Sequence, residues 1–116
     1  MASSASTPKK FEWLVVIPDT PGALAKRLEV RPTHFANLGP HIESGALPMG
    51  GAILSDIPKD DDPKSLDFVG STIVYVASSR EEVLEFLKND IYGKTGVWDI
   101  EKVQMWPFKC AVRKPI

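Results

Sequence analysis

The sequence predicts an α+β fold of the ferredoxin-like kind, with a four-stranded antiparallel sheet and two helices on one face. Strand-like and helix-like segments alternate in the order β-α-β-β-α-β along the chain, and a strand–helix–strand crossover is right-handed almost without exception. The length of 116 residues suits one domain around one hydrophobic core. We therefore expect a single domain over residues 11–112, with tails at residues 1–10 and 113–116.

The N-terminal part of this domain is predicted to begin with a buried strand at Phe11–Ile17, a short apolar run rich in valine, isoleucine and aromatic residues. Asp19–Gly22 then offers a helix cap candidate followed by proline at a first helical position. A helical stripe of apolar residues comes next, but Pro32 and Pro40 interrupt it, because proline lacks an N–H and clashes with the preceding turn. We therefore expect two or three short helical pieces between residues 20 and 44. The stripe consists of Leu24, Leu28, Phe35, Leu38 and Ile42.

The middle of the chain predicts two strands joined by an acidic loop. Ala46–Ser55 is apolar and contains the pair Gly50-Gly51, which suggests a strand with a bulge or a close backbone approach. Gly70–Ala77 alternates between two faces as a strand does. The segment between them, Asp56–Lys64, is acidic and contains proline, so it is expected to be the most mobile part of the domain.

The last third predicts one helix and one strand. Ser78 or Ser79 is placed to cap a helix that ends near residues 89–93, and glutamates fill its first turn, where the helix dipole favours acidic groups. Trp98–Val112 is expected to form a long final strand interrupted at Pro107. Several strands are apolar on both faces, so the sheet face away from the helices needs a cover, and a second copy of the chain is the simplest one. We therefore expect a homodimer.

Composition excludes several classes of partner. A net charge of −1 gives no basic surface for nucleic acid and no polybasic anchor for membranes, and no apolar run approaches the roughly 20 residues of a membrane-spanning helix. Cys110 is the only cysteine, so we expect neither an intrachain disulfide nor a cysteine-based metal site. The first ten residues lack the apolar stretch of a secretory signal. These features predict a cytoplasmic protein without metal or other cofactor.

The residues from Arg27 to His34 are the best candidate for a functional site, because imidazole can take or give a proton near neutral pH. On a helical wheel Arg27 and His34 lie at the edge of the apolar stripe and Arg31 lies within it, where a helix meets its sheet and a cleft can open. The two arginines could bind a substrate carboxylate or enolate, or could instead tether the helix through a salt bridge. A structural histidine bonded to backbone near the proline kink is the alternative for His34.

The aromatic residues could line an apolar pocket with polar groups, although aromatic residues on strands more often belong to the core or to an interface. Tyr92 and Trp106 are the candidates for substrate contact. Asp90, close to Tyr92 in the chain, could pair with His34 or simply bond to the amides of a turn, as helix-terminal aspartates often do.

Several short motifs occur in an order and spacing that resemble the YCII-related family of the dimeric α+β barrel superfamily. The resemblance covers about residues 11 to 109, and no single motif is decisive without the others. It rests on Arg27-x-x-x-Arg31-Pro-x-His34, Gly45-x-Leu47-x-x-Gly50, Gly70-Ser71-Thr72, Asn89-Asp90-x-Tyr92, Gly96-Val97 and Trp106-Pro107-Phe108-Lys109. It implies a dimeric α+β barrel with a histidine–aspartate pair, here His34 and Asp90, in a cleft between helix and sheet. The chain departs from the family in two places: Ile91 follows Asp90 where proline is common, and the acidic loop is unusually long.

Two functions remain open from the sequence. The first is a cofactor-independent lyase or isomerase in which His34 is the general acid or base, Asp90 orients it, and Arg31 stabilises negative charge on a small hydroxylated or aromatic metabolite. The analogy to other enzymes of the superfamily supports this reaction class, not the residues alone. The second is a non-catalytic dimer that binds a small ligand or another protein. A hydrogen bond between His34 and Asp90 at the wall of a pocket would favour the enzyme.

Overall fold

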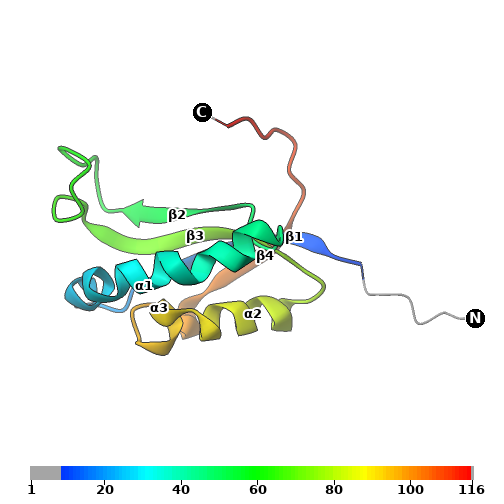
Figure 1. The fold of residues 1–116 in the computed structure, drawn as a ribbon, viewed down its shortest axis with the longest axis horizontal. Helices are drawn as coiled ribbons and strands as arrows, with labels where there is room; N and C mark the ends of the chain where they lie inside the picture. Colours follow the sequence, from blue (N-terminus) through cyan, green and yellow to red (C-terminus); the bar gives the residue numbers. More distant parts are fainter. Residues whose placement is uncertain (1–8, 116) are drawn as a thin grey trace, which may run out of the picture.

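The computed structural model describes residues 9–115 and confirms the predicted α+β fold, with an antiparallel sheet in the order β2-β3-β1-β4 (Figure 1). The strands are β1 (Phe11–Pro18), β2 (Met49–Leu54), β3 (Phe68–Ala77) and β4 (Gln104–Phe108), and the helices are α1 (Leu24–Glu43), α2 (Arg80–Asn89) and the short α3 (Ile91–Lys94). The helices lie on one face of the sheet, which is the ferredoxin-like arrangement. Most of the predicted N-terminal tail, residues 1–10, and Ile116 lie outside the described residues.

The helix α1 differs from its prediction, because it runs unbroken from Leu24 to Glu43 with both prolines inside it. Pro32 and Pro40 are exposed, so the carbonyl groups that lose a helical N–H partner lie on the solvent side, where water can bond to them. The predicted cap is also wrong: Ala23 occupies the N-cap position and no side chain caps the helix. Asp19 instead pairs with Arg27 inside the domain.

The second strand and the final strand also differ from their predicted bounds. The strand β2 is shorter than predicted, and its irregularity lies at Ile53/Leu54, not at the glycine pair. The long final strand is divided, since Trp98 makes only an isolated bridge with Asp19 and a 3-10 turn at Ile100–Lys102 precedes β4. Pro107 lies inside β4, which is possible because β4 is an edge strand and only one of its sides is paired.

The second helix begins as predicted, with the hydroxyl of Ser79 accepting a hydrogen bond from the amide of Glu82. Asp90 then serves two helices: its backbone N–H bonds to the carbonyl of Phe86 at the end of α2, and its side chain accepts from the amide of Tyr92 at the start of α3. The negative end of α2 would repel a carboxylate, but the N-terminus of α3 attracts it. The side chain of Asp90 is therefore fixed by the local chain.

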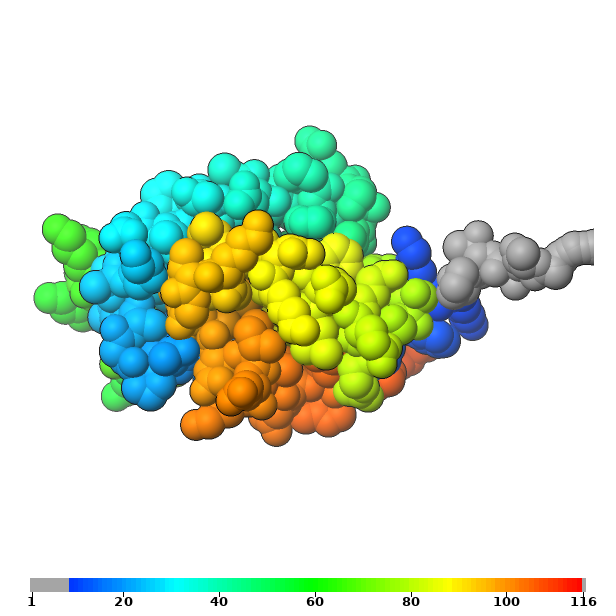
Figure 2. Space-filling view, turned by 90° about the horizontal axis from the view of Figure 1, so that it is seen from below, coloured from blue at the N-terminus to red at the C-terminus, as the bar shows by residue number. Residues whose placement is uncertain are grey.

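The buried core fills only one half of the space between sheet and helices. It lies where α2, α3 and the segment after α3 pack on β1 and β3, and it includes Val15, Ile17, Ile73, Val83, Leu87, Val97 and Trp98. In α1, by contrast, Arg27 is the one buried residue. Figure 2 shows α1 beside the α2–α3 pair on this face, with the β2–β3 loop at the same end as the start of α1. The later part of the apolar stripe of α1, from Phe35 to Ile42, thus borders a space that the core does not fill.

Candidate functional site

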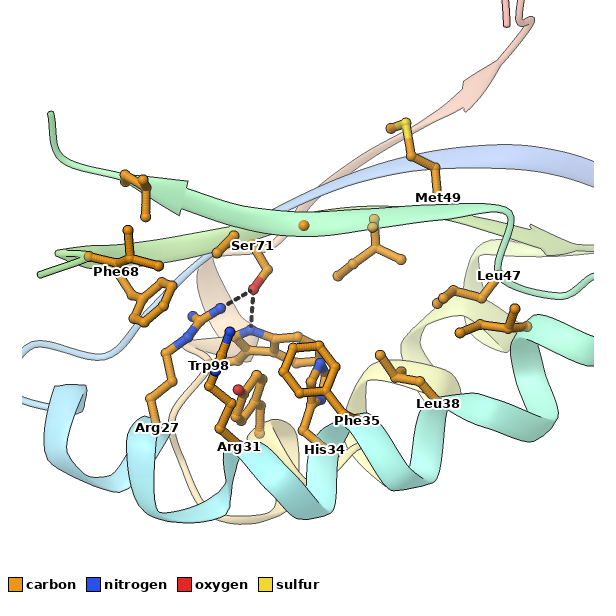
Figure 3. A pocket seen from close by; sticks show the side chains of 18 of the residues that line it. Arg27, Arg31, His34, Phe35, Leu38, Leu47, Met49, Phe68, Ser71 and Trp98 are labelled. Atoms are coloured by element: carbon orange, nitrogen blue, oxygen red, sulfur yellow. Dashed lines mark hydrogen bonds between the residues drawn. The ribbon is translucent and has the colours of Figure 1, made fainter. Parts of the chain in front are cut away.

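A cavity of about 570 Å³ lies between α1 and the β2–β3 half of the sheet. Part of its wall is the predicted apolar stripe, because Phe35, Leu38 and Ile42 line the cavity, although Leu38 also packs against the core. The polar groups of the wall gather at one end, near the start of α1 (Figure 3). They come from Arg27, Arg31, His34, Asp61, Ser71, Tyr92 and Trp98, whereas Tyr75 lies farther along β3, where its ring stacks on Phe86. The volume and the mostly apolar wall with a few converging polar groups are typical of a small-molecule site.

The structure brings His34 and Asp90 together from opposite parts of the chain, with Nδ1 of His34 at 2.9 Å from Oδ1 of Asp90. The same oxygen accepts a hydrogen bond from the amide of Tyr92, also at 2.9 Å. Both side chains are mostly shielded from solvent. The ring of Tyr92 stacks on the imidazole with centroids 3.9 Å apart, so the histidine ring is held by one hydrogen bond and one stacked face.

The hydrogen bond between His34 and Asp90 determines which nitrogen of the imidazole can accept a proton. A carboxylate only accepts hydrogen bonds, so Nδ1 of His34 carries the proton that it donates to Asp90. In the neutral ring Nε2 is then the nitrogen with a free lone pair. His34 lines the cavity, and its arrangement suits the transfer of a proton to and from a bound molecule.

The buried Arg27 is occupied by contacts within the protein. Its Nη1 donates to both carboxylate oxygens of Asp19, at 2.7 and 2.8 Å, and its Nη2 donates to the hydroxyl of Ser71 at 3.0 Å. The guanidinium group also lies 4.8 Å from the ring centroids of Phe68 and of Tyr92. The charge of Arg27 is therefore balanced by Asp19, as in the tethering alternative, although the residue remains part of the cavity wall.

Arg31 is the cation of the cavity wall that keeps its charge unbalanced. It lies over the ring of Phe35, 4.8 Å from the centroid, and within the described residues it forms no salt bridge. A cation in such an apolar setting attracts a negatively charged oxygen. Of the two arginines, Arg31 is therefore the one available to a bound anion.

The two tyrosines of the wall stay neutral at physiological pH. Burial, and then the charge of Asp90, raises the pKa of Tyr75. Burial also raises the pKa of Tyr92, while the charges of Arg27 and Arg31 partly oppose that rise. Both hydroxyl groups can therefore act as hydrogen-bond donors, but not as bases.

Among the predicted contact residues, Tyr92 lies at the cavity and Trp106 does not. Trp106 pairs with Leu14, while its neighbour Met105 pairs with Val15 and is buried in the core. Since side chains alternate along a strand, Trp106 points to the opposite face of the sheet. The expectation that Trp106 contacts a ligand in this cavity was wrong, because the sequence does not reveal which face of an edge strand is turned inward.

Several residues in the cavity wall or bonded to it were not predicted to be functional. Ser71 was noticed only as part of a motif, and Asp19 only as a helix cap candidate. The acidic loop, for which the sequence predicted only mobility, contributes Pro58 and Asp61 to the wall. No pattern in the sequence marks these contacts, because each depends on how the β2–β3 loop and the start of α1 meet in space.

Residues 9–115 contain no group of three or more histidine, cysteine, aspartate or glutamate side chains placed to hold a metal ion. No helix in this range is both long and apolar enough to cross a membrane.

Comparison with known proteins finds relatives among fungal biosynthesis proteins. Fusaric acid biosynthesis protein 2 of Gibberella fujikuroi is 35% identical over 98 residues, which are 84% of this chain and 92% of that protein. An aspartate kinase of Fusarium oxysporum f. sp. lycopersici is 35% identical over 100 residues, which are 86% of this chain. The chain spans only 18% of that kinase's length, so the similarity concerns one part of the larger protein.

A solved structure shares the fold. It is the 5-chloro-2-hydroxyhydroquinone dehydrochlorinase of Burkholderia phenoliruptrix in complex with 2,5-dihydroxybenzoquinone, with a TM-score of 0.71 and 28% sequence identity. The match covers 86% of this chain and 95% of the dehydrochlorinase chain. The family profile of the YCII-related domain matches residues 11–109. The chain therefore belongs to the YCII-related domain family.

Proposed function

We propose that the protein is a cofactor-independent enzyme that moves a proton on a small hydroxylated or aromatic metabolite, as an isomerase, dehydratase or other lyase. The observation that carries this proposal is the 2.9 Å contact between His34 and Asp90 at the wall of a cavity of about 570 Å³. A structural histidine bonded to backbone would leave no such arrangement. The pair has the geometry that a general base and its orienting group require.

The reaction would use three side chains in different ways. Nε2 of His34 accepts a proton from the bound molecule, and the carboxylate of Asp90 stabilises the imidazolium ion that results. The electron pair left on the substrate moves to an oxygen atom as an enolate or phenolate, and Arg31 offers that oxygen a positive charge. Return of the proton to another atom gives isomerisation, and loss of a leaving group gives elimination.

The comparisons support this class of chemistry without naming a substrate. The structural neighbour is a dehydrochlorinase of a hydroxylated aromatic compound, and one relative is named for fusaric acid biosynthesis. The alternative, a non-catalytic module that binds a small ligand, would use the same cavity without proton transfer. The two functions therefore differ in turnover and not in binding.

The test is a screen of hydroxylated quinones and hydroquinones, including 5-chloro-2-hydroxyhydroquinone, in deuterated buffer followed by NMR. We expect the protein to accelerate exchange or elimination on at least one of them, and His34→Gln to lose this activity. His41→Gln is the matched control, since His41 is the other histidine of the sequence and does not line this cavity. Activity that survives in His34→Gln would contradict the proposal. If compounds bind but none of them undergoes exchange or elimination, the non-catalytic module is favoured.

We also propose that the chain forms a homodimer through the sheet face away from the helices. Alternation along the strands places an apolar set on this face: Leu14, Val16, Met49, Val74, Val76, Trp106 and Phe108. Trp106 is 47% exposed, and Met49 and Phe108 are exposed as well. Three large apolar side chains exposed on one sheet face are unusual on a monomer, and a second copy of the same face would cover them.

Replacing Trp106 by glutamate should convert the dimer to a monomer in sedimentation velocity experiments, because the substitution places a charge within the apolar patch. Ile57→Glu is the matched control: Ile57 lies in the β2–β3 loop, is 91% exposed, and its substitution should leave the dimer intact. A monomeric parent protein over the whole accessible concentration range would refute the interface.

A further inference from the structure

We propose that Ser71 is a ligand-binding residue whose hydroxyl donates a hydrogen bond to a carbonyl or negatively charged oxygen of the molecule bound beside His34. This inference rests on the proposed function. It adds that the end of the cavity at Ser71 donates a hydrogen bond and therefore prefers an oxygen acceptor on the ligand. The ligand class that fits is a hydroxyquinone, phenolate or enolate, in which such an oxygen lies on or next to the reacting ring.

The direction of the hydrogen bond follows from the two partners that Ser71 already has. Nη2 of Arg27 lies 3.0 Å from its hydroxyl oxygen, and Nε1 of Trp98 lies 3.1 Å from it. A guanidinium group and an indole N–H can only donate hydrogen bonds. Both lone pairs of the Ser71 oxygen are therefore used, and the hydroxyl can only donate in its remaining direction.

The donor that remains has no partner among the described residues, since both hydrogen bonds found for the Ser71 hydroxyl are accepted by it. Ser71 is only 4% exposed, and a buried hydroxyl proton without an acceptor is unfavourable. The residue lines the cavity (Figure 3), so an oxygen atom of a bound molecule can supply the missing acceptor.

The surroundings of Ser71 make its hydroxyl a strong donor. Arg27 is charged, and a hydroxyl that accepts a bond from a cation is polarised and donates more strongly. The indole of Trp98, which holds Ser71 on one side, lies 6.1 Å between ring centroids from the imidazole of His34. The donor and the base are thus two neighbouring parts of one wall.

The arrangement also discriminates between ligands. A ligand that presents an N–H or a C–H to Ser71 would leave the hydroxyl proton unpaired, whereas a carbonyl or phenolate oxygen would pair it. In Arg27, Nη1 donates to Asp19 and one N–H of Nη2 donates to Ser71, so a large part of its donor capacity is already used within the protein. The positive charge of Arg27 therefore acts on the ligand through the Ser71 hydroxyl, which it polarises.

The experiment compares the binding of 2,5-dihydroxybenzoquinone to the full chain and to its variants by calorimetry. We expect Ser71→Ala to weaken binding about tenfold or more, as the loss of a charge-assisted hydrogen bond does. Thr72→Val is the matched control: the Thr72 hydroxyl also bonds within the sheet, to the carbonyl of Val15 at 3.0 Å, but Thr72 does not line the cavity. That variant should bind the quinone as the parent does.

A second pair of variants keeps the test valid if Ser71→Ala folds poorly. Ser71→Thr and Ser71→Val have almost the same shape and differ in the hydroxyl, and we expect binding near the parent affinity only with threonine. Binding that Ser71→Ala or Ser71→Val leaves within twofold of the parent would overturn the role of Ser71 alone. Failure of the parent protein to bind the quinone would overturn this role together with the ligand class of the proposed function.

Discussion

Replacing Arg27 by methionine is expected to lower the free energy of unfolding by about 3–5 kcal/mol, the cost of removing one partner from a buried ion pair. The side chains of Arg27 and Asp19 are 5% and 7% exposed, so the carboxylate of Asp19 would remain buried without its cation. The substitution would also remove a donor from Ser71. The pair joins the first half of α1 to the residue that follows β1, and no other residue of α1 is buried.

Urea unfolding followed by tryptophan fluorescence measures this loss. Lys26→Met is the matched control: Lys26 is next in the sequence and pairs with Glu29 in solvent, so its loss should cost within about 0.5 kcal/mol. The double variant Asp19→Asn/Arg27→Met should be more stable than Arg27→Met, because no buried charge is left unpaired. Equal losses in Arg27→Met and Lys26→Met would contradict the structural role of the pair.

Replacing Asp90 by asparagine is expected to reduce turnover about 10⁴-fold, the effect seen when the carboxylate that orients a catalytic histidine becomes an amide. An amide NH₂ turned toward His34 would donate to Nδ1 and shift the ring proton to Nε2, so the nitrogen that serves as base would be protonated. The oxygen of Asp90 that faces His34 is also the one that accepts from the amide of Tyr92, so an NH₂ group turned toward His34 would give up this capping bond and weaken the start of α3.

Two measurements separate the catalytic effect of Asp90 from its structural one. Nitrogen NMR of the imidazole rings reports the tautomer, and the sequence contains only two histidines, so the signals of His34 can be assigned with His41→Gln. Asp90→Ala is the companion variant: it also loses the capping bond to Tyr92, at a cost of about 1 kcal/mol, but it places no donor next to Nδ1 of His34. If Asp90→Asn kept its activity with the ring proton shifted to Nε2, the dyad would have no catalytic role.

The fold could be predicted because its determinants are local. The Ser79 cap, the short apolar run of β1 and the order of elements are all readable from neighbouring residues. The continuity of α1 could not be predicted, because it requires Pro32 and Pro40 to face solvent. The face that a helix turns to solvent is set only when the helix packs against the sheet. The division of the last strand is a similar case, because the bridge between Asp19 and Trp98 joins residues far apart in sequence.

The site could be predicted in part, and the reason lies in the kinds of residue involved. A histidine with a possible carboxylate partner is conspicuous by its chemistry, and the family resemblance selected Asp90 as that partner. Ser71 and Asp19 are common residue types whose importance comes from what they touch, so sequence reasoning gave them no such role. Trp106 shows the opposite error, since a conspicuous residue type lies on the face away from the cavity.

The position of Asp90 between two helices has a consequence for how the site can come apart. The helix α3 has only four residues, too few to persist without outside support, and one oxygen of Asp90 bonds both to its first turn and to His34. Tyr92, within the same turn, stacks on the imidazole. Local unfolding of this turn would therefore dismantle the histidine–aspartate pair while the sheet stays intact, so the rate at which this turn opens would limit how long the site stays assembled.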